Sequence, residues 1–506
     1  MGIPLAVAPS NPVPGLHLTV NLLYGAASPG SGTIRALLVG PKNETGGDMT
    51  QDTEIRTVNS PEDVKTAAGQ GSLPHLAYKA LFANDPTARV DLLCPTKSGG
   101  TAATGTITYS GAITTDGTVR HWIQGRVIDV PWNVGEDVDA MVTKAVAYIN
   151  RYADDLFVTA TDAVGAGIVD LTAKGKGPAG NDVTLRARII EGCAGGTVGV
   201  SAATLTNGAT EPVFTTALAS AQGTEYDFIV LCCSNADTNA ASGNNPANLE
   251  THITGLNTGL NAKLQQGVVA STATIAAAKT GAVGRNEETI EHLCGVGLES
   301  LPCELAGAEC GDRMRRRKLN PNSNRIGTEL KGLYPSADIL GDNPTEAEAI
   351  DAMQNGVSLI AYTATGTLTL MRPITTHSQD AAGNPDVRCF DVNEVDALYD
   401  YAKDLRAALP QEFKQAKIAK DRVAGDEPLP EGVVEESDVK QFIISRTKGF
   451  WVPKGVIDGD AFDAAVANGT FVVEVNATDP TQVDIFIPAE PYKILSKFGL
   501  YIAKAG

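Results

Sequence analysis

Histidine is the side chain most often used for proton transfer in catalysis, and this 506-residue chain has six of them. No HExxH metal motif and no GxSxG nucleophile elbow occurs in the sequence. The segment THSQD brings His377, Ser378 and Asp380 together, but neighbours in one loop point in different directions and do not form a triad. We therefore predict that the protein is not an enzyme. The six histidines are His17, His75, His121, His252, His292 and His377.

A glycine-rich segment, GKGPAG at residues 175–180, matches the GxGxxG pattern of dinucleotide-binding proteins. That pattern needs a strand before it and a helix after it, so that the helix N-terminus faces the pyrophosphate. Here NDVTLRARI follows, which is typical of a strand. We expect a turn between two strands and predict no cofactor. The segment VGPKNETGG at residues 39–47 also follows a strand, but it lacks the Gly-Lys-Ser/Thr of a phosphate-binding loop.

The eight cysteines do not have the paired short spacings of a zinc site. Cys303 and Cys310 are too far apart for a CxxC hook, and Cys232 and Cys233 lie inside the apolar run FIVLCCS. We predict no metal, and we expect buried, reduced thiols in a protein assembled in the cytoplasm. The other cysteines are scattered, at Cys94, Cys193, Cys294 and Cys389.

The densest run of charge is RMRRRK, and its arginines are Arg313, Arg315, Arg316 and Arg317. Three interpretations are open: a phosphate site, a solvated helix end, or a contact with an acidic surface on another copy of the chain. The net charge of −19 argues against a general nucleic-acid binder, because phosphate affinity needs an excess of basic residues. We retain these four arginines as possible inter-subunit charge contacts.

Bulk composition places the chain among globular proteins, with 43% apolar and 20% charged residues. Its length suggests roughly two to four domains. The first residues show no basic region followed by an apolar stretch, so we expect no signal peptide. No run of about 18 apolar residues predicts a membrane span, and we expect no direct membrane insertion.

Strands that alternate with helices favour a largely parallel, helix-covered sheet. TIRALLVG, RVDLLC and EYDFIVLCC read as buried strands, and SPEDVKTAAG opens a helix with Ser60 as N-cap and Pro61 at the first position. The amino-acid composition becomes rich in Gly, Thr and Val between residues 96 and 215, and then the alternation of strands and helices resumes. We predict an α/β (α+β) multidomain fold with a helix-covered core sheet, an inserted β-rich domain and extended terminal strands.

Two terminal segments alternate apolar and polar residues, as a strand with one buried face does. Either each segment edges the sheet of its own domain, or it pairs with a neighbouring copy. We expect linking arms at residues 1–32 and 481–506, a discontinuous core at 33–95 and 216–480, probably of two subdomains, and the insert at 96–215. The apolar arm positions are Leu16, Leu18, Val20 and Leu22 at the start, and Ile494, Phe498, Leu500 and Ile502 at the end.

Four stretches, in this order along most of the chain, resemble the tail sheath proteins of contractile-tailed phages, specifically the Mu-like branch. The first is VPGLHLTVN, and the second is GRVIDVPWNVGEDVDAMVTKAVAYIN with VDLTAKGKGPAGNDVTLR. The third runs from NGVSLIAYTATGTLTLMRPITTHSQD to DVNEVDALYDYAKDLRAAL, and the fourth is VDIFIPAEPYKILSKFGLYI. The match is less clear at residues 298–340 and 425–470.

The resemblance implies a structural subunit that polymerises around an inner tube and contracts to drive the tube through a bacterial envelope. It also implies terminal arms that add strands to the sheets of adjacent subunits, and an insert that faces outward. The implied partners are further copies in stacked rings or a helical sheath, the inner tail tube protein, and the baseplate and tail terminator proteins. The implied location is the virion tail, assembled in the host bacterial cytoplasm. Two alternatives are an α/β hydrolase-like enzyme with an unlocated site, and a non-contractile shell or adhesin component.

Overall fold

The structure is a computed structural model of the chain. It describes residues 18–19, 34–97, 99–163, 167–259, 262–386, 388, 390–422 and 429–495, with the backbone alone at residues 18–19. Several separate sheets and many helices make up this part of the chain. The predicted mixed α/β class with a helix-covered core sheet is therefore confirmed. The domain limits given above stay a prediction.

An eight-stranded sheet forms the centre, in the order β17-β16-β15-β14-β12-β2-β4-β3. Its six inner strands run parallel, and the edge strands β17 and β3 run antiparallel to their neighbours. The antiparallel pair β16 and β17 is the hairpin that residues 355–375 predict. The strands are β2 (Arg35–Val39), β3 (Ile55–Val58), β4 (Arg89–Leu93), β12 (Phe228–Leu231), β14 (Gln266–Ser271), β15 (Ile290–Cys294), β16 (Ser358–Tyr362) and β17 (Leu368–Arg372).

Helices cover both faces of this sheet, because its parallel strands are apolar on both sides. In β2, Ala36 and Leu38 join one apolar cluster, whereas Leu37 and Val39 join a different one. The first cluster includes α1 (Pro61–Ala68), α2 (Leu73–Asn84) and α8 (Pro302–Leu319), and the second includes α4 (Thr215–Ser220) and α6 (Asn245–Leu256). The remaining helices of this region are α5 (Asn235–Thr238), α7 (Ile275–Arg285) and α9 (Glu346–Gln354).

Local signals set the ends of several helices. Ser60 caps α1 as predicted: its side chain accepts a hydrogen bond from the Asp63 amide, and Pro61 is the first helical residue. Helices α2 and α8 then pack backbone to backbone. A Cβ atom at Gly307 would lie 2.2 Å from the carbonyl oxygen of Ala77, so only glycine permits this approach.

The chain leaves the core after β4 and returns at β12, on the other side of β2. Between them lie a three-stranded sheet, β10-β6-β7, and a four-stranded sheet, β11-β5-β9-β8. The helical spacing of Val138, Met141, Val142, Ala145 and Ile149 in the sequence predicts one apolar face; the last four are buried and Val138 is half-buried. The elements are β5 (Ala102–Ser110), β6 (Gly117–Ile123), β7 (Arg126–Trp132), α3 (Val138–Asn150), β8 (Val158–Ala163), β9 (Ile168–Lys176), β10 (Leu185–Glu191) and β11 (Thr197–Val200).

One tight turn of this inserted region reaches into the core. Gln124, between β6 and β7, has a φ of 50° and is fully buried. Its amide nitrogen Nε2 donates to Oε2 of Glu304 near the start of α8 at 3.0 Å, and its Oε1 accepts from the amide of Phe157 at 2.9 Å. The bond to Glu304 thus joins the insert to the core, and the bond from Phe157 holds Gln124 within the insert.

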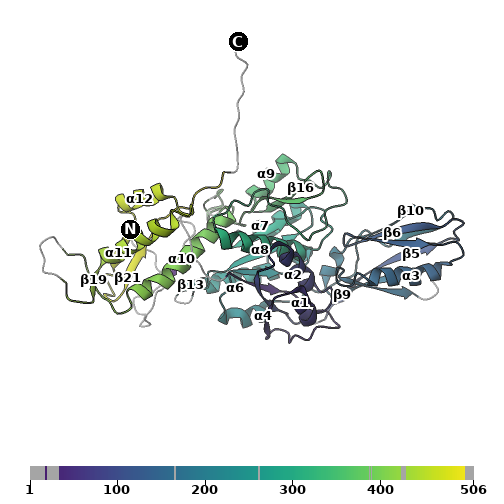
Figure 1. Cartoon of the computed structure of the whole chain (residues 1–506), viewed down its shortest axis with the longest axis horizontal. Coiled ribbons are helices and arrows are strands. Elements are labelled where there is room, and N and C mark those ends of the chain that lie inside the picture. The colour runs from purple at the N-terminus through teal and green to yellow at the C-terminus, as the bar shows by residue number, and fades with distance from the viewer. Residues whose placement is uncertain are drawn as a thin grey trace, which may run out of the picture.

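The last part of the chain has an apolar core of its own. Residues 391–409 have apolar residues at helical spacing in the sequence, which predicts a helix with one apolar face, and Val395, Leu398, Tyr399, Ala402, Leu405 and Leu409 are indeed all buried. Figure 1 shows an elongated molecule, with the insert at one end, the eight-stranded sheet in the middle and this region at the other end. The elements are α10 (Val392–Glu412), β18 (Lys417–Ala419), β19 (Val433–Glu435), α11 (Glu436–Arg446), a π-helical turn η4 (Thr447–Trp451), α12 (Gly459–Ala467), β20 (Val472–Val475) and β21 (Val483–Phe486).

Candidate functional site

The polar motifs of the sequence do not form a catalytic arrangement in the described residues. Nε2 of His377 lies 3.1 Å from Asp386, and Asp380 accepts hydrogen bonds from Asn384 instead. The glycine-rich segment at residues 175–180 is the predicted turn between strands: β9 ends at Lys176, a short 3-10 turn follows, and β10 begins at Leu185. No group of three or more His, Cys, Asp or Glu side chains among the described residues is arranged to hold a metal ion.

Seven of the eight cysteines are free and buried, as expected, and Cys389 lies outside the described residues. Burial raises the pKa of the Cys94 and Cys294 thiols to about 12, so both are neutral at physiological pH. Within the described part of the chain, no helix combines the length and the apolar character that a membrane crossing needs.

The carboxyl ends of parallel strands are where open α/β sheets usually bind ligands. Here the chain's own insert contacts the end of β12. Asp182, beside β10, accepts a hydrogen bond from the Asn235 amide at 2.8 Å, and Glu211 accepts one from the Ser234 hydroxyl at 2.9 Å. This edge therefore holds the insert in place.

The first terminal segment is described only at β1 (Leu18–Thr19). It pairs antiparallel with β13 (Thr258–Gly259) of the same chain, with Leu18 opposite Gly259. The described pairing of Leu18 is thus within its own chain, as in the first of the two interpretations of the arms. The other predicted positions of this arm, Leu16, Val20 and Leu22, lie outside the described residues.

The second terminal segment is fixed to the body at its root, residues 490–495. The amide of Tyr492 donates to the carbonyl of Val456 at 3.1 Å, and the carbonyl of Tyr492 accepts from Nδ2 of Asn322 at 2.9 Å. Nζ of Lys493 lies 2.9 Å from the carboxylate of Glu394 at the start of α10. Ile494 is half-buried, whereas Phe498, Leu500 and Ile502 lie outside the described residues.

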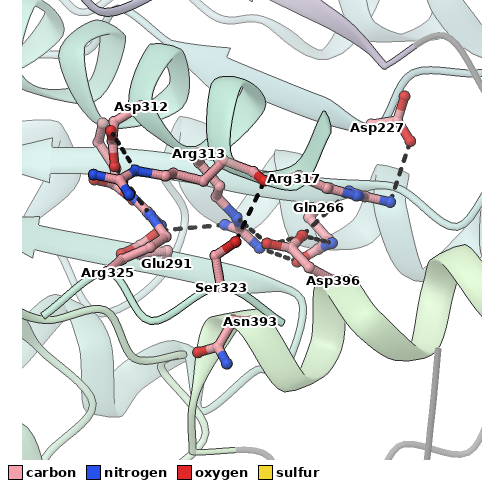
Figure 2. A network of polar contacts seen from close by, with 12 residues as sticks. Asp227, Gln266, Glu291, Asp312, Arg313, Arg317, Ser323, Arg325, Asn393 and Asp396 are labelled. Carbon is pink, nitrogen blue, oxygen red and sulfur yellow. Dashed lines mark hydrogen bonds and ion pairs between the residues drawn. The ribbon is translucent and has the colours of Figure 1, made fainter. Parts of the chain in front are cut away.

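The basic cluster on α8 is largely an internal feature (Figure 2). Nε of Arg313 donates to Asp396 at 2.9 Å, and Arg317 pairs with Asp400. The side chains of Arg313 and Arg317 are only 2% and 1% exposed. The prediction that these two arginines contact another subunit is therefore wrong, because the carboxylates of their own chain surround them.

Arg315 and Arg316, which lie between Arg313 and Arg317 on α8, are partly exposed to solvent. Arg315 and Arg316 remain 44% and 34% exposed, although both side chains approach the buried Asp312, at 2.7 and 3.5 Å. An inter-subunit role for this pair stays a prediction. Arg313 and Arg317, four residues apart, lie on the buried face of α8, whereas Arg315 and Arg316 lie on its exposed face.

The network joins the core sheet, α8 and α10 through buried charges. Arg313 also contacts Glu291 on β15 at 3.2 Å, and Arg325 pairs with Glu309 and Asp312. Burial alone would raise the pKa of the Asp396 carboxyl, but the Arg313 and Arg317 guanidiniums outweigh burial and lower it. Burial and the neighbouring Glu309 carboxyl raise the pKa of Glu291 well above its usual range.

This network was missed from the sequence, although it has a readable signal. Arg313 and Arg317 are four residues apart on one helix, and Asp396 and Asp400 are four residues apart on another. Residues at this spacing share a helix face, so two such pairs can match across a helix contact. The sequence gives no indication that α8 and α10 meet.

Neither a protein-family model nor a curated protein matches the sequence. Solved structures of tail sheath proteins are similar to most of the chain. The sheath tail protein from Desulfitobacterium hafniense is 13% identical, with 95% of this chain and 100% of that chain covered and a TM-score of 0.45. The sheath tail protein from Listeria innocua is 14% identical, with 86% and 87% covered and a TM-score of 0.40.

The helical sheath of the anti-feeding prophage in its contracted state is 11% identical, with 98% of this chain and 100% of that chain covered and a TM-score of 0.46. TM-scores below 0.5 at such identities do not establish a shared function. The function has to be inferred from the residues and contacts of this chain.

Proposed function

We propose that this chain is a structural subunit of a contractile tail sheath, which polymerises around an inner tube and contracts to drive the tube through a bacterial envelope. The observation that carries the proposal is the fixed root of the C-terminal segment. Tyr492 is held by Asn322, which follows α8, and Lys493 by Glu394 on α10, directly before the alternating apolar positions that begin at Ile494. A strand with one apolar face, starting from a fixed point on the body, is suited to pairing with a partner.

A suitable acceptor lies in the same region of the chain. Strands β20 and β21 form a sheet of two strands among the described residues. A two-stranded hairpin is marginally stable by itself, and an added strand would extend its ladder and its apolar face. Val473 and Ile485 on these strands, and Ile487 just after them, are partly buried against the apolar core of the last part of the chain. We propose that arms of neighbouring copies pair with this hairpin.

The modest free energy that one exchanged arm can contribute favours an assembly held by several arms at once. An exchanged strand with four ladder bonds at ~1 kcal/mol each, together with three or four buried aliphatic side chains, contributes roughly 5–8 kcal/mol before the costs of association. One arm alone would therefore bind at micromolar concentration at best. Two arms per subunit in a closed lattice act together, so the assembly becomes effectively permanent.

The pairing of Leu18 within its own chain is compatible with exchange between copies. Among the described residues it joins Leu18–Thr19 to Thr258–Gly259. The same segment of a neighbouring copy can take this place with the same paired residues, as in domain swapping. We propose that the N-terminal arm exchanges in this way during assembly.

The finer assignments belong to the same proposal. We propose membership of the Mu-like branch, contacts with the inner tail tube, baseplate and tail terminator proteins, and a place in the virion tail after assembly in the host cytoplasm. Contraction would use the difference between two packings of the subunit bodies rather than nucleotide hydrolysis. The subunit therefore has no catalytic role in this proposal.

Negative-stain electron microscopy of the purified full-length protein tests the function. A sheath subunit should form hollow tubes of uniform bore at micromolar concentration or above. A hydrolase-like enzyme would remain a small particle, and a shell or adhesin component would give closed shells or irregular fibres. Particles of either of these kinds under a range of salt and protein concentrations would contradict the proposal.

A further inference from the structure

Exposed apolar and basic side chains gather around the root of the C-terminal segment. Leu319 is 75% exposed at the end of α8, and Leu495 is 64% exposed. Tyr492 and Phe450 are exposed as well. The basic side chains beside them, all exposed or half-buried, are Arg315, Arg316, Lys454 and Lys493. We call these eight residues the root surface.

Hydrogen bonds between segments join the root surface into one continuous region. Asn320, which follows Leu319, donates to the carbonyl of Lys454 at 3.1 Å. Asn322 donates to the carbonyl of Tyr492, and the ring of Phe450 lies 4.1 Å from Nζ of Lys454. The carboxylates that touch its cations, Asp312 and Glu394, are themselves buried. Counted together with the exposed Glu490 of segment 490–495, the root surface has four cations and one exposed carboxylate, so it is net basic and apolar on a chain whose net charge is −19.

A second surface, on and before α9, has the opposite charge. Leu340 is 88% exposed and Ile350 is 50% exposed. The exposed acidic side chains of the same segment, residues 338–351, are Asp338, Glu346, Glu348 and Asp351. One cation is close, because Nζ of Lys279 lies 2.6 Å from Asp351. We call the two apolar and four acidic residues the α9 surface, which is acidic and apolar.

We propose that the root surface of one copy docks on the α9 surface of a second copy. Each surface combines large exposed apolar side chains with an excess of charge of one sign. Their charges are opposite, whereas two average surfaces of this acidic chain would repel each other. Complementary charge sets the orientation and speeds the encounter, and the apolar side chains add buried area.

This contact rests on the proposed function, because it is one of the body-to-body contacts of the assembly. It adds a particular pair of surfaces to the strand exchange of the arms. It also gives Arg315 and Arg316, which the packing of α8 leaves exposed, an acidic surface to contact. Surface charges are screened beyond about 8 Å at physiological salt, so the contact acts at short range.

Charge reversal tests the pairing. We would compare Arg315→Glu/Arg316→Glu, Glu346→Lys/Asp351→Lys and the combination of all four with the wild type, by sedimentation and electron microscopy of full-length protein. Each pair alone should raise the protein concentration needed for assembly by about tenfold or more, and the combination should return it to within about threefold of the wild type. Arg151→Glu/Arg188→Glu, a matched reversal at two exposed arginines of the insert, should assemble as the wild type does.

The outcomes separate this contact from the function itself. Wild-type tubes together with unimpaired assembly of both reversed pairs would overturn the pairing and leave the sheath proposal intact. A combined variant that assembles as poorly as either reversed pair alone would also overturn the pairing and leave the sheath proposal intact. Wild-type protein that forms no tubes would contradict both proposals. If the glutamates near Asp312 prevent folding, Arg315→Gln/Arg316→Gln replaces them and should still weaken assembly by about threefold or more.

Discussion

Nε of Arg313 lies 2.9 Å from the carboxylate Oδ2 of Asp396, and both side chains are 2% exposed although 83 residues separate them in the sequence. The pair joins α8, which lies in the middle of the molecule (Figure 1), to α10 (Figure 2). Helix α10 in turn contributes to the apolar core of the last part of the chain. Glu394, two residues before Asp396 on α10, holds Lys493 at the root of the C-terminal segment. The buried network and the segment root therefore share the start of α10.

Removal of Asp396 should destabilise the chain strongly. In Asp396→Ala, Arg313 and Arg317 would each lose a carboxylate while remaining buried, and breaking a buried pair in this way typically costs about 3–5 kcal/mol. Urea denaturation followed by circular dichroism measures the loss as a lower free energy of unfolding. Asp129→Ala, which removes the partner of Arg120 on the exposed side of the insert, is the control and should have a much smaller effect.

A second variant of the network separates charge pairing from packing. Replacing both members of one pair, as in Arg317→Met/Asp400→Leu, leaves less uncompensated charge than removing Asp400 alone. We expect the double variant to be more stable than Asp400→Ala. Equal stability of the two variants would contradict this expectation, because it would mean that leaving Arg317 buried without Asp400 costs no free energy.

Close packing of α2 and α8 predicts a steric effect at Gly307. A Cβ atom there would lie 2.2 Å from the Ala77 carbonyl oxygen, so Gly307→Val should force the helices apart at a cost of about 1–3 kcal/mol or more. Gly255 in α6 is an exposed helical glycine with open space around it, and Gly255→Ala should be neutral or stabilising by up to about 1 kcal/mol. Thermal unfolding of both variants checks the contrast. Similar melting temperatures for Gly307→Val and the wild type would contradict the close approach.

Stability should depend on pH through Glu304, the buried partner of Gln124. Burial raises the pKa of this carboxyl from about 4.5 to about 7. A raised pKa means that the folded chain holds the proton more tightly, so this contribution is present at low pH and is lost as the pH rises toward 7. Relative to Glu304→Gln, the wild type should therefore become less stable between about pH 5 and pH 8, by up to about 3 kcal/mol.

Denaturant titrations of the wild type and Glu304→Gln at several pH values measure this difference. Glutamine keeps an oxygen that can accept from the Leu301 amide, which donates to Glu304 at 2.7 Å. A constant difference between the two proteins over the whole pH range would mean that Glu304 does not titrate there.

Deletion of residues 496–506 should abolish assembly and leave the fold intact. This truncation keeps Tyr492 and Lys493 and therefore their contacts with the body. A cut before Pro491 would remove both residues and these contacts. We expect a soluble monomer with an unchanged circular dichroism spectrum and no tubes under the microscope. A truncated protein that unfolds would support the alternative in which this segment edges the sheet of its own domain.

Local patterns in the sequence predicted much of the core correctly. The apolar runs of β2, β4 and β12, the cap at Ser60 and the hairpin of β16 and β17 each depend on residues within one short stretch. The buried face of α10 and the turn at residues 175–180 were also predicted, because helical periodicity and glycine turns act over a few residues. Residues 483–486 of the expected C-terminal arm pair with β20 of their own chain, whereas residues 496–506 and most of residues 1–32 lie outside the described residues, so the outward pairing of the arms stays a prediction.

The roles of the arginines on α8 could not be read from the same patterns. A run of basic residues near a helix end usually faces water, and the sequence alone does not show that Asp396 and Asp400 lie opposite this run. The amino-acid sequence by itself determined the strands, the helices and their apolar faces, since neighbouring residues set backbone preference and periodicity. Only the tertiary structure decided that Arg313 and Arg317 are buried while Arg315 and Arg316 are exposed, because that depends on which carboxylates the packing of α8 against α10 brings within hydrogen-bonding distance.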